Sequence, residues 1–173
     1  KEKKKTKATE AMAKGLEPFA TWIMSFPYED IIEEAKKYVN DQVASTDEAI
    51  EGAKYIIAEM ISDDANYRKS LRQEMVNYGL VVTNVKKNAV DEKKTYEMYY
   101  DYSEPVSKIK PHRILAINRA ENEKIITVKI DLDKERMTSY LERKIISRKE
   151  STAAPYIKEA IEDALKRLIY PSL

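Results

Sequence analysis

Apolar side chains recur every three or four residues along most of this chain, and this helical period constrains its fold more than any other feature. The clearest stretch follows Ser45, which has capping-box spacing with Glu48. One face of the helix expected there carries Ile50, Ala53, Ile57, Met60 and Ile61. A chain patterned in this way is expected to be mainly helical.

Caps and breakers predict the limits of the other helices. We expect a short helix over Thr9–Lys14 that stops at Gly15, one behind Pro18 that Pro27 breaks, and one from about Tyr28 to Asn40. Ser62 is expected to cap a helix that ends at Gly79, and Pro111 to open one that runs to about Glu123. Asp133 is expected to cap a helix over residues 134–146, and Ser151 the last helix, with Pro155 in its first turn.

Two β-branched runs interrupt this pattern and predict strands at residues 80–86 and 125–131. The fold class expected is therefore mainly α, a multi-helix domain with a small two-stranded β element packed on helices. We expect a helical lobe with a basic N-terminal arm over residues 1–79. A helical lobe with the two strands is expected over residues 80–173, the two forming one continuous module of a larger protein.

Composition excludes several kinds of chemistry. There is no Cys, a single His and only 3 Gly, which removes disulfides, Cys-ligated zinc, His-pair metal motifs and glycine-rich phosphate loops. Asp131, Asp133 and Glu135 alternate at a strand end, but capping and solvation explain them better than a two-metal centre. We therefore expect no enzyme, no cofactor and no metal. The lack of Cys suits a cytoplasmic protein.

Charge is balanced overall, at +1, but unevenly distributed. Residues 27–66 hold 3 bases and 11 acids, and residues 67–130 hold 13 bases and 8 acids. The most concentrated basic cluster is at the start, and its candidate phosphate-binding side chains are Lys3, Lys4, Lys5 and Lys7. The alternative is a solvated arm without a ligand.

Two further patterns are compatible with nucleic acid. Tyr96, Tyr99, Tyr100 and Tyr102 could stack on bases, but the acids among them favour a packed core patch with outward-bonded hydroxyls. His112 and Arg113 lie at an expected helix start, where backbone N–H groups could help them to hold a phosphate, with Arg119 further along. The alternative for this pair is a structural role.

Several separate motifs together resemble one family. They are Lys4-Lys5-Thr6-Lys7-Ala8, Gly15-Leu16-Glu17-Pro18, Tyr100-Asp101-Tyr102-Ser103-Glu104-Pro105, Pro111-His112-Arg113-Ile114-Leu115-Ala116-Ile117-Asn118-Arg119 and Lys166-Arg167-Leu168-Ile169-Tyr170-Pro171-Ser172. In order and spacing the chain is similar to the N-terminal region of the bacterial Tex-type transcription accessory proteins. Where that family usually has Gly after the Arg of the His-Arg helix, this chain has Ala120, so we expect the helix to continue past Arg119.

The resemblance implies a cytoplasmic, modular protein that is linked to transcription and binds nucleic acid, RNA in particular, chiefly through downstream domains. The function expected for this chain is a non-catalytic helical scaffold for those domains, in contact with them and with the transcription machinery, and not with membranes. One alternative is a direct nucleic-acid-binding helical module, and another is a protein–protein interaction module of the transcription machinery. Nucleic-acid binding by the chain itself is expected to be weak and non-specific.

Overall fold

The computed structural model describes residues 5–172, and this part of the chain forms two compact units. The helical unit comprises the chain up to Lys69 together with the segment from Thr138 onward, and the sheet unit comprises Ser70–Met137. These limits differ from the lobes expected at 1–79 and 80–173. The difference arises because the last helices pack against the first ones, so the helical unit is discontinuous in sequence.

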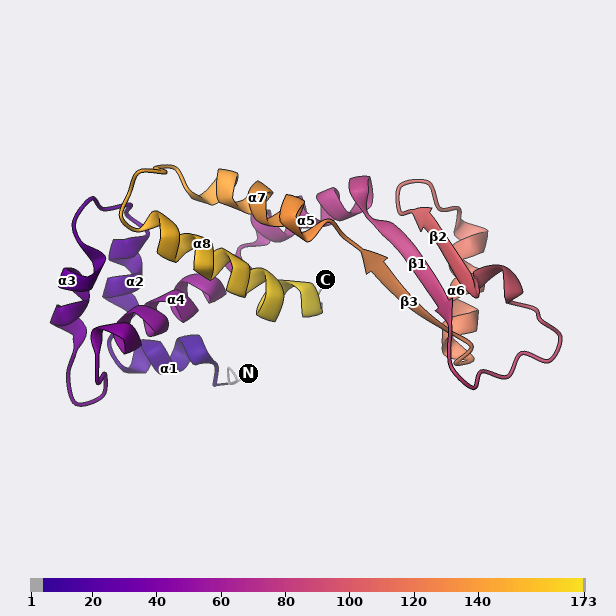
Figure 1. The fold of residues 1–173 in the computed structure, drawn as a ribbon, viewed down its shortest axis with the longest axis horizontal. Coiled ribbons are helices and arrows are strands. Elements are labelled where there is room, and N and C mark those ends of the chain that lie inside the picture. Colours follow the sequence, from indigo (N-terminus) through magenta and orange to yellow (C-terminus); the bar gives the residue numbers. More distant parts are fainter. Residues whose placement is uncertain (1–4, 173) are drawn as a thin grey trace. The chain divides into compact units, whose positions relative to one another are not determined.

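The helical unit is built around α4 (Thr46–Asp63), against which α1, α2, α3 and α8 all pack (Figure 1). Ser45 caps α4, since its hydroxyl oxygen accepts a hydrogen bond from the Glu48 N–H at 3.1 Å. Buried residues occur all around α4 rather than along one stripe, among them Ala49, Ile56 and Ile61. Other elements of this unit are α1 (Lys7–Ala13), α2 (Glu17–Ile23), α3 (Ile31–Ala35), η1 (Lys36–Tyr38), α8 (Ala154–Asp163), the π-helical η3 (Ala164–Ile169) and η4 (Tyr170–Ser172). It also contains most of α7 (Lys134–Ile145).

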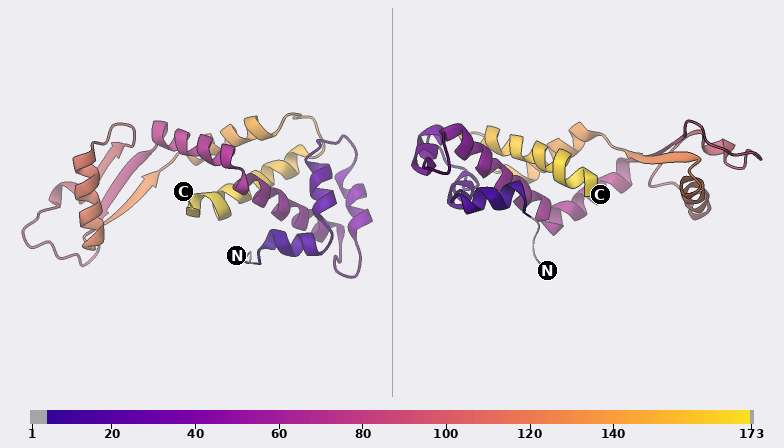
Figure 2. Two further views of the ribbon diagram at one scale, coloured as in Figure 1. Left: turned by 180° about the vertical axis from the view of Figure 1, so that it is seen from behind. Right: turned by 90° about the horizontal axis from the view of Figure 1, so that it is seen from below.

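The sheet unit holds an antiparallel sheet of three strands in the order β2-β1-β3, counted over the described residues. Its strands are β1 (Leu80–Val85), β2 (Asp101–Pro105) and β3 (Ile126–Asp131), with Val82 opposite Ser103 on one side and Lys129 on the other. The short η2 (Glu97–Tyr99) precedes β2, and α6 (Pro111–Asn122) follows it. Figure 2 shows α6 against one face of this sheet. Val81, Ile117, Ala120 and Ile126 form the core between them.

The mainly helical fold class with minor β structure is confirmed, and both expected strands are present. The expectation of only two strands is wrong, because Asp101–Pro105 pairs with β1 along its other edge. This segment contains Asp, Ser, Glu and Pro, which are uncommon in strands. Its pairing therefore comes from the neighbouring strand and not from its own propensity.

Four helix starts also differ from expectation. Helix α1 begins at Lys7 behind the cap Thr6 rather than at Thr9, and α8 begins at Ala154 behind Ala153 rather than behind Ser151. Ser62 lies inside α4, and the residue that caps α5 (Ala65–Tyr78) is Asp64, whose Oδ1 accepts hydrogen bonds from Asn66 and Tyr67 N–H. The helix expected from Tyr28 is shorter, because Asp30 caps it at Ile31. By contrast, Asp133 caps α7 (Lys134–Ile145) through the Arg136 N–H, as expected.

Candidate nucleic-acid interface

The basic N-terminal cluster is described only in part. Lys3 and Lys4 lie outside the described residues. Lys5 is largely exposed, and its Nζ lies 3.8 Å from the Glu10 carboxylate, a surface pair of little energetic weight. The Nζ of Lys7 lies 4.9 Å from the centre of the Tyr55 ring on α4, close enough for a cation–π contact. Lys5 therefore remains available at the surface, while Lys7 also contributes to packing in the helical unit.

The tyrosine segment is part of the core of the sheet unit. Tyr99 is only 7% exposed, and its ring meets the Tyr102 ring edge-on at 5.4 Å. Tyr96 and Tyr100 also pack against this core. Rings held in this way have little free face for a base to stack on, so the packed-patch interpretation is confirmed.

Each of the three partly buried tyrosines donates its hydroxyl hydrogen to a carboxylate. Tyr96 bonds Glu123, Tyr100 bonds Asp91 at 2.8 Å, and Tyr102 bonds Glu104. These hydrogen bonds favour the neutral phenol, so they raise the pKa of all three hydroxyls.

Asp91 has a second role, because its carboxylate closes the loop that precedes η2. It accepts the backbone N–H groups of Thr95 at 3.1 Å and Tyr96 at 2.9 Å. The Tyr96 N–H is the largest cause that lowers the pKa of Asp91, with further contributions from the Tyr100 hydroxyl and the Thr95 N–H. This acid in the tyrosine segment is thus a structural hydrogen-bond acceptor.

Arg113 is held by internal contacts. Its Nη1 lies 3.1 Å from Glu104 Oε2 on β2 and also donates to the Tyr102 hydroxyl, and its guanidinium lies 5.8 Å from the Tyr102 ring centre. The hydrogen bond from Tyr102, followed by that from Arg113, lowers the pKa of Glu104. Arg113 therefore ties α6 to the edge strand β2, which leaves less of its hydrogen-bonding capacity for a phosphate.

His112 and Arg119 are differently placed, since both are exposed on α6. They are seven residues apart, nearly two helical turns, and so share one face of the helix. Leu115 lies between them along the helix and is 63% exposed. Among the described residues neither side chain forms an ion pair or a side-chain hydrogen bond. Of the predicted site residues on α6, these two remain free to contact a ligand.

The acids weighed as metal ligands do not converge. Asp133 is used as the cap of α7. Within residues 5–172, no group of three or more His, Asp or Glu side chains is arranged to hold a metal ion. The same part of the chain contains no helix with the length and apolar character needed to span a bilayer.

A second basic feature was not predicted. Three cations, Arg143, Lys149 and Lys158, line a surface pocket between α7 and α8 in the helical unit. They are separated by up to 15 positions, and only the turn between the two helices brings them together. The available sequence signal was the helical spacing of Ser139, Glu142 and Arg143, which places these three on one face of α7, with Ile146 directly after the end of that helix.

Comparison with known proteins shows which family and which relatives this chain resembles. The model of the family described as Tex central region-like matches residues 27–173. The uncharacterized protein YdcI of Bacillus subtilis strain 168 is 45% identical over 177 residues, covering 100% of this chain and 25% of that protein.

More distant relatives carry functional names. The transcriptional accessory protein Tex of Neisseria gonorrhoeae is 30% identical over 74% of this chain and 17% of its own length. The human S1 RNA-binding domain-containing protein 1 is 31% identical over 98% of this chain and 18% of its own length. The chain thus spans a quarter or less of each of these relatives.

Proposed function

The chain belongs to the Tex central region-like family, and from this premise we propose that it is a non-catalytic helical scaffold within a Tex-type transcription accessory protein. In this proposal the protein is cytoplasmic and binds nucleic acid, RNA in particular, mainly through regions outside this chain. The chain itself contacts those regions and, through them, the transcription machinery.

The observation that carries this proposal is the packing of the tyrosine segment, residues 96–102, inside the sheet unit. Aromatic and basic side chains interleaved on a surface would support base stacking and phosphate contact. Here the rings pack in the core, their hydroxyls bond Glu123, Asp91 and Glu104, and Arg113 is paired with Glu104. The residues best suited to a nucleic-acid platform are thus used to hold α6 and β2 together, which is what a scaffold requires.

A direct nucleic-acid-binding module is the second candidate, and one observation favours it. His112 and Arg119 are exposed on the same face of α6 and, within the described chain, form no ion pair. Two N–H-bearing side chains at this spacing, one of them the cationic Arg119, could contact one strand of phosphates. They supply few contacts, however, so this surface would add to binding made elsewhere.

Titration of the chain with single- and double-stranded RNA and DNA at two salt concentrations tests the proposal. We expect a non-specific Kd of roughly 10⁻⁴–10⁻⁶ M at physiological salt, and a log–log salt slope of about −0.9 for each phosphate contact on duplex DNA. Replacing Lys3, Lys4, Lys5 and Lys7 with Ala should flatten that slope equally for all sequences. Nanomolar binding that is insensitive to salt would contradict the scaffold role.

The same variants separate the two candidates. If the double variant His112→Ala/Arg119→Ala flattens the slope and the lysine variant does not, α6 is the contact surface and the direct module is favoured. Catalysis is tested on the same substrates with added divalent metal. Cleavage that disappears in Asp131→Asn or Asp133→Asn would refute the non-catalytic assignment.

A further inference from the structure

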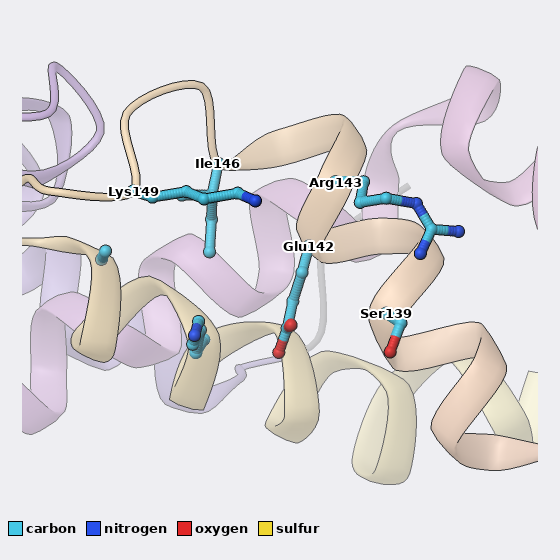
Figure 3. A pocket seen from close by; sticks show the side chains of 7 residues that line it. Ser139, Glu142, Arg143, Ile146 and Lys149 are labelled. Atoms are coloured by element: carbon cyan, nitrogen blue, oxygen red, sulfur yellow. The ribbon is translucent and has the colours of Figure 1, made fainter.

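A pocket of about 350 Å³ lies between α7 and α8, entirely within the helical unit. Ser139, Glu142 and Arg143 come from one face of α7, Ile146 and Lys149 from the turn between the helices, and Lys158 from α8. In the view of Figure 3, the side chains of Arg143 and Lys149 extend on opposite sides of Glu142. The pocket volume falls in the range of small-molecule sites, roughly 300–1,000 Å³.

The charges around this pocket are not neutralised by the protein. Arg143, Lys149 and Lys158 are all exposed, and no ion pair within the described residues involves any of them. Glu142 contributes one negative charge, which leaves the lining at a net +2. Cations gathered in a hollow raise the local concentration of anions, so the pocket favours an anionic ligand.

The hydrogen-bond donors that line the pocket narrow the class of anion that it would bind. Guanidinium presents paired N–H donors that match a phosphate, ammonium groups bind phosphate as point charges, and the Ser139 hydroxyl can donate a further hydrogen bond. The pocket also has an apolar part, because Ile146 and Ala154 line it and are each nearly buried. A phosphate joined to a compact carbon framework would fit both parts.

Glu142 selects the ligand further. An ionised carboxylate accepts hydrogen bonds and donates none, so beside a bare phosphate it would only repel. Its presence is favourable if the ligand also carries a hydroxyl donor near the phosphate. A ribose phosphate has this combination, and its 2′-hydroxyl is the group that distinguishes RNA from DNA.

We propose that the α7–α8 pocket binds a ribose phosphate, with Arg143, Lys149 and Lys158 around the phosphate and Glu142 accepting a hydrogen bond from the ribose hydroxyl. The source is either one nucleotide of an RNA strand or a free ribonucleotide. This inference does not depend on the scaffold role, because it adds a small direct site to a chain whose binding is otherwise weak.

The test measures binding of the full 173-residue chain to a fluorescein-labelled 12-nucleotide RNA and to DNA of the same sequence. One hydrogen bond to the ribose should give a preference for RNA of about 3- to 10-fold. Arg143→Ala with Lys158→Ala should reduce the steepness of the salt dependence by about 1.4, since each phosphate contact on a single strand contributes about 0.7. Lys166→Ala is the matched control, because Lys166 is an exposed lysine of the same unit that does not line the pocket.

Glu142 distinguishes ribose recognition from simple charge attraction. Glu142→Ala should bring the RNA-to-DNA preference to about one, whereas Glu142→Gln keeps an acceptor oxygen and should retain most of it. If charge alone governs binding, Glu142→Ala strengthens RNA and DNA binding equally, and the proposal is refuted.

Competition identifies the source of the ligand. Displacement of the labelled RNA by uridine monophosphate points to a free ribonucleotide, and displacement by unlabelled RNA alone points to a strand. Displacement by a polyglutamate peptide at least as effective as displacement by unlabelled RNA would overturn the proposal in favour of an acidic protein partner. An equal effect of Lys166→Ala and Lys158→Ala would also overturn it.

Discussion

Replacing Gly79 with alanine is expected to destabilise the sheet unit, because this residue joins α5 to β1 where there is no room for a side chain. A Cβ at Gly79 would lie 2.5 Å from the backbone carbonyl oxygen of Met75, closer than real Cβ atoms approach. It would also lie 3.3 Å from side-chain atoms of Ile130 and Leu132. The same Met75 carbonyl accepts the Gly79 N–H at 2.7 Å, so the backbone cannot rotate away without weakening that hydrogen bond.

The magnitude follows from three contributions. Overpacking costs about 1–3 kcal/mol, and the weakened hydrogen bond about 1 kcal/mol. Alanine restricts the backbone of the unfolded chain more than glycine does, which stabilises the folded state by about 0.4–1 kcal/mol. The net loss is about 2 kcal/mol. The equilibrium constant for opening of the sheet unit should therefore rise about 30-fold, and the exchange protection of its amides should fall by the same factor.

Hydrogen exchange of the β1 amides is the appropriate assay, because the single tryptophan, Trp22, lies in the helical unit and does not report on the sheet. Gly15→Ala serves as the control. Gly15 has φ +82°, and no atom lies within 4 Å of the place that a Cβ would occupy there. Alanine at this position therefore strains the backbone of the helical unit without a clash and should leave β1 unchanged. Unchanged β1 protection in Gly79→Ala would refute the steric reasoning.

Three further outcomes are expected. Thr83→Val should lower the free energy of unfolding, measured by urea titration, by about 1–2 kcal/mol, because it removes the buried hydrogen bond from Thr83 Oγ1 to the Tyr99 carbonyl. The control Thr127→Val, at an exposed position, should change the free energy of unfolding little. Because folding lowers the pKa of Asp91, the stabilising contribution of this carboxylate is complete above the ordinary carboxyl pKa of about 4 and is lost as pH falls through the folded value. The protection of the Tyr96 amide against hydrogen exchange, relative to its intrinsic rate, should fall in that range, and Asp91→Asn should remove this dependence on pH. Because folding raises the pKa values of Tyr96, Tyr100 and Tyr102, the contribution of their hydroxyl groups to stability is complete below the ordinary tyrosine pKa of about 10 and is lost as pH rises through the folded values. Ultraviolet titration should therefore show tyrosines that ionise at higher pH than free tyrosine, with one fewer of them in Tyr102→Phe.

The helices were predictable where local signals were complete. Ser45 before α4, Pro111 at the start of α6 and Asp133 before α7 each act within a few residues of their own position. The continuation of α6 past Arg119 likewise follows from Ala120, which has no tendency to end a helix. Such elements depend on nearest neighbours in sequence and can be read from it.

The elements that were missed depend on distant partners. Asp101–Pro105 forms a strand because β1 offers it an edge, and nothing in its own composition indicates this. Asp64 replaces Ser62 as a cap because α4 continues two residues beyond Ile61, the last residue of its apolar pattern, and so includes Ser62.

The candidate site shows the same division. The carboxylates among the tyrosines correctly indicated a packed patch. The ion pair of Arg113 with Glu104 could not be predicted, because it requires knowing that β2 lies beside α6. The pocket cations Arg143, Lys149 and Lys158 meet only through the α7–α8 turn.

The most direct measurement compares RNA binding by this chain with that of the longer relative YdcI, of which the matching segment is 25%, at one salt concentration. If nucleic-acid binding resides mainly outside this chain, the chain should bind at least about tenfold more weakly, because it lacks the additional contacts of the longer protein. Equal affinities would contradict the scaffold proposal and make this chain the principal binding region.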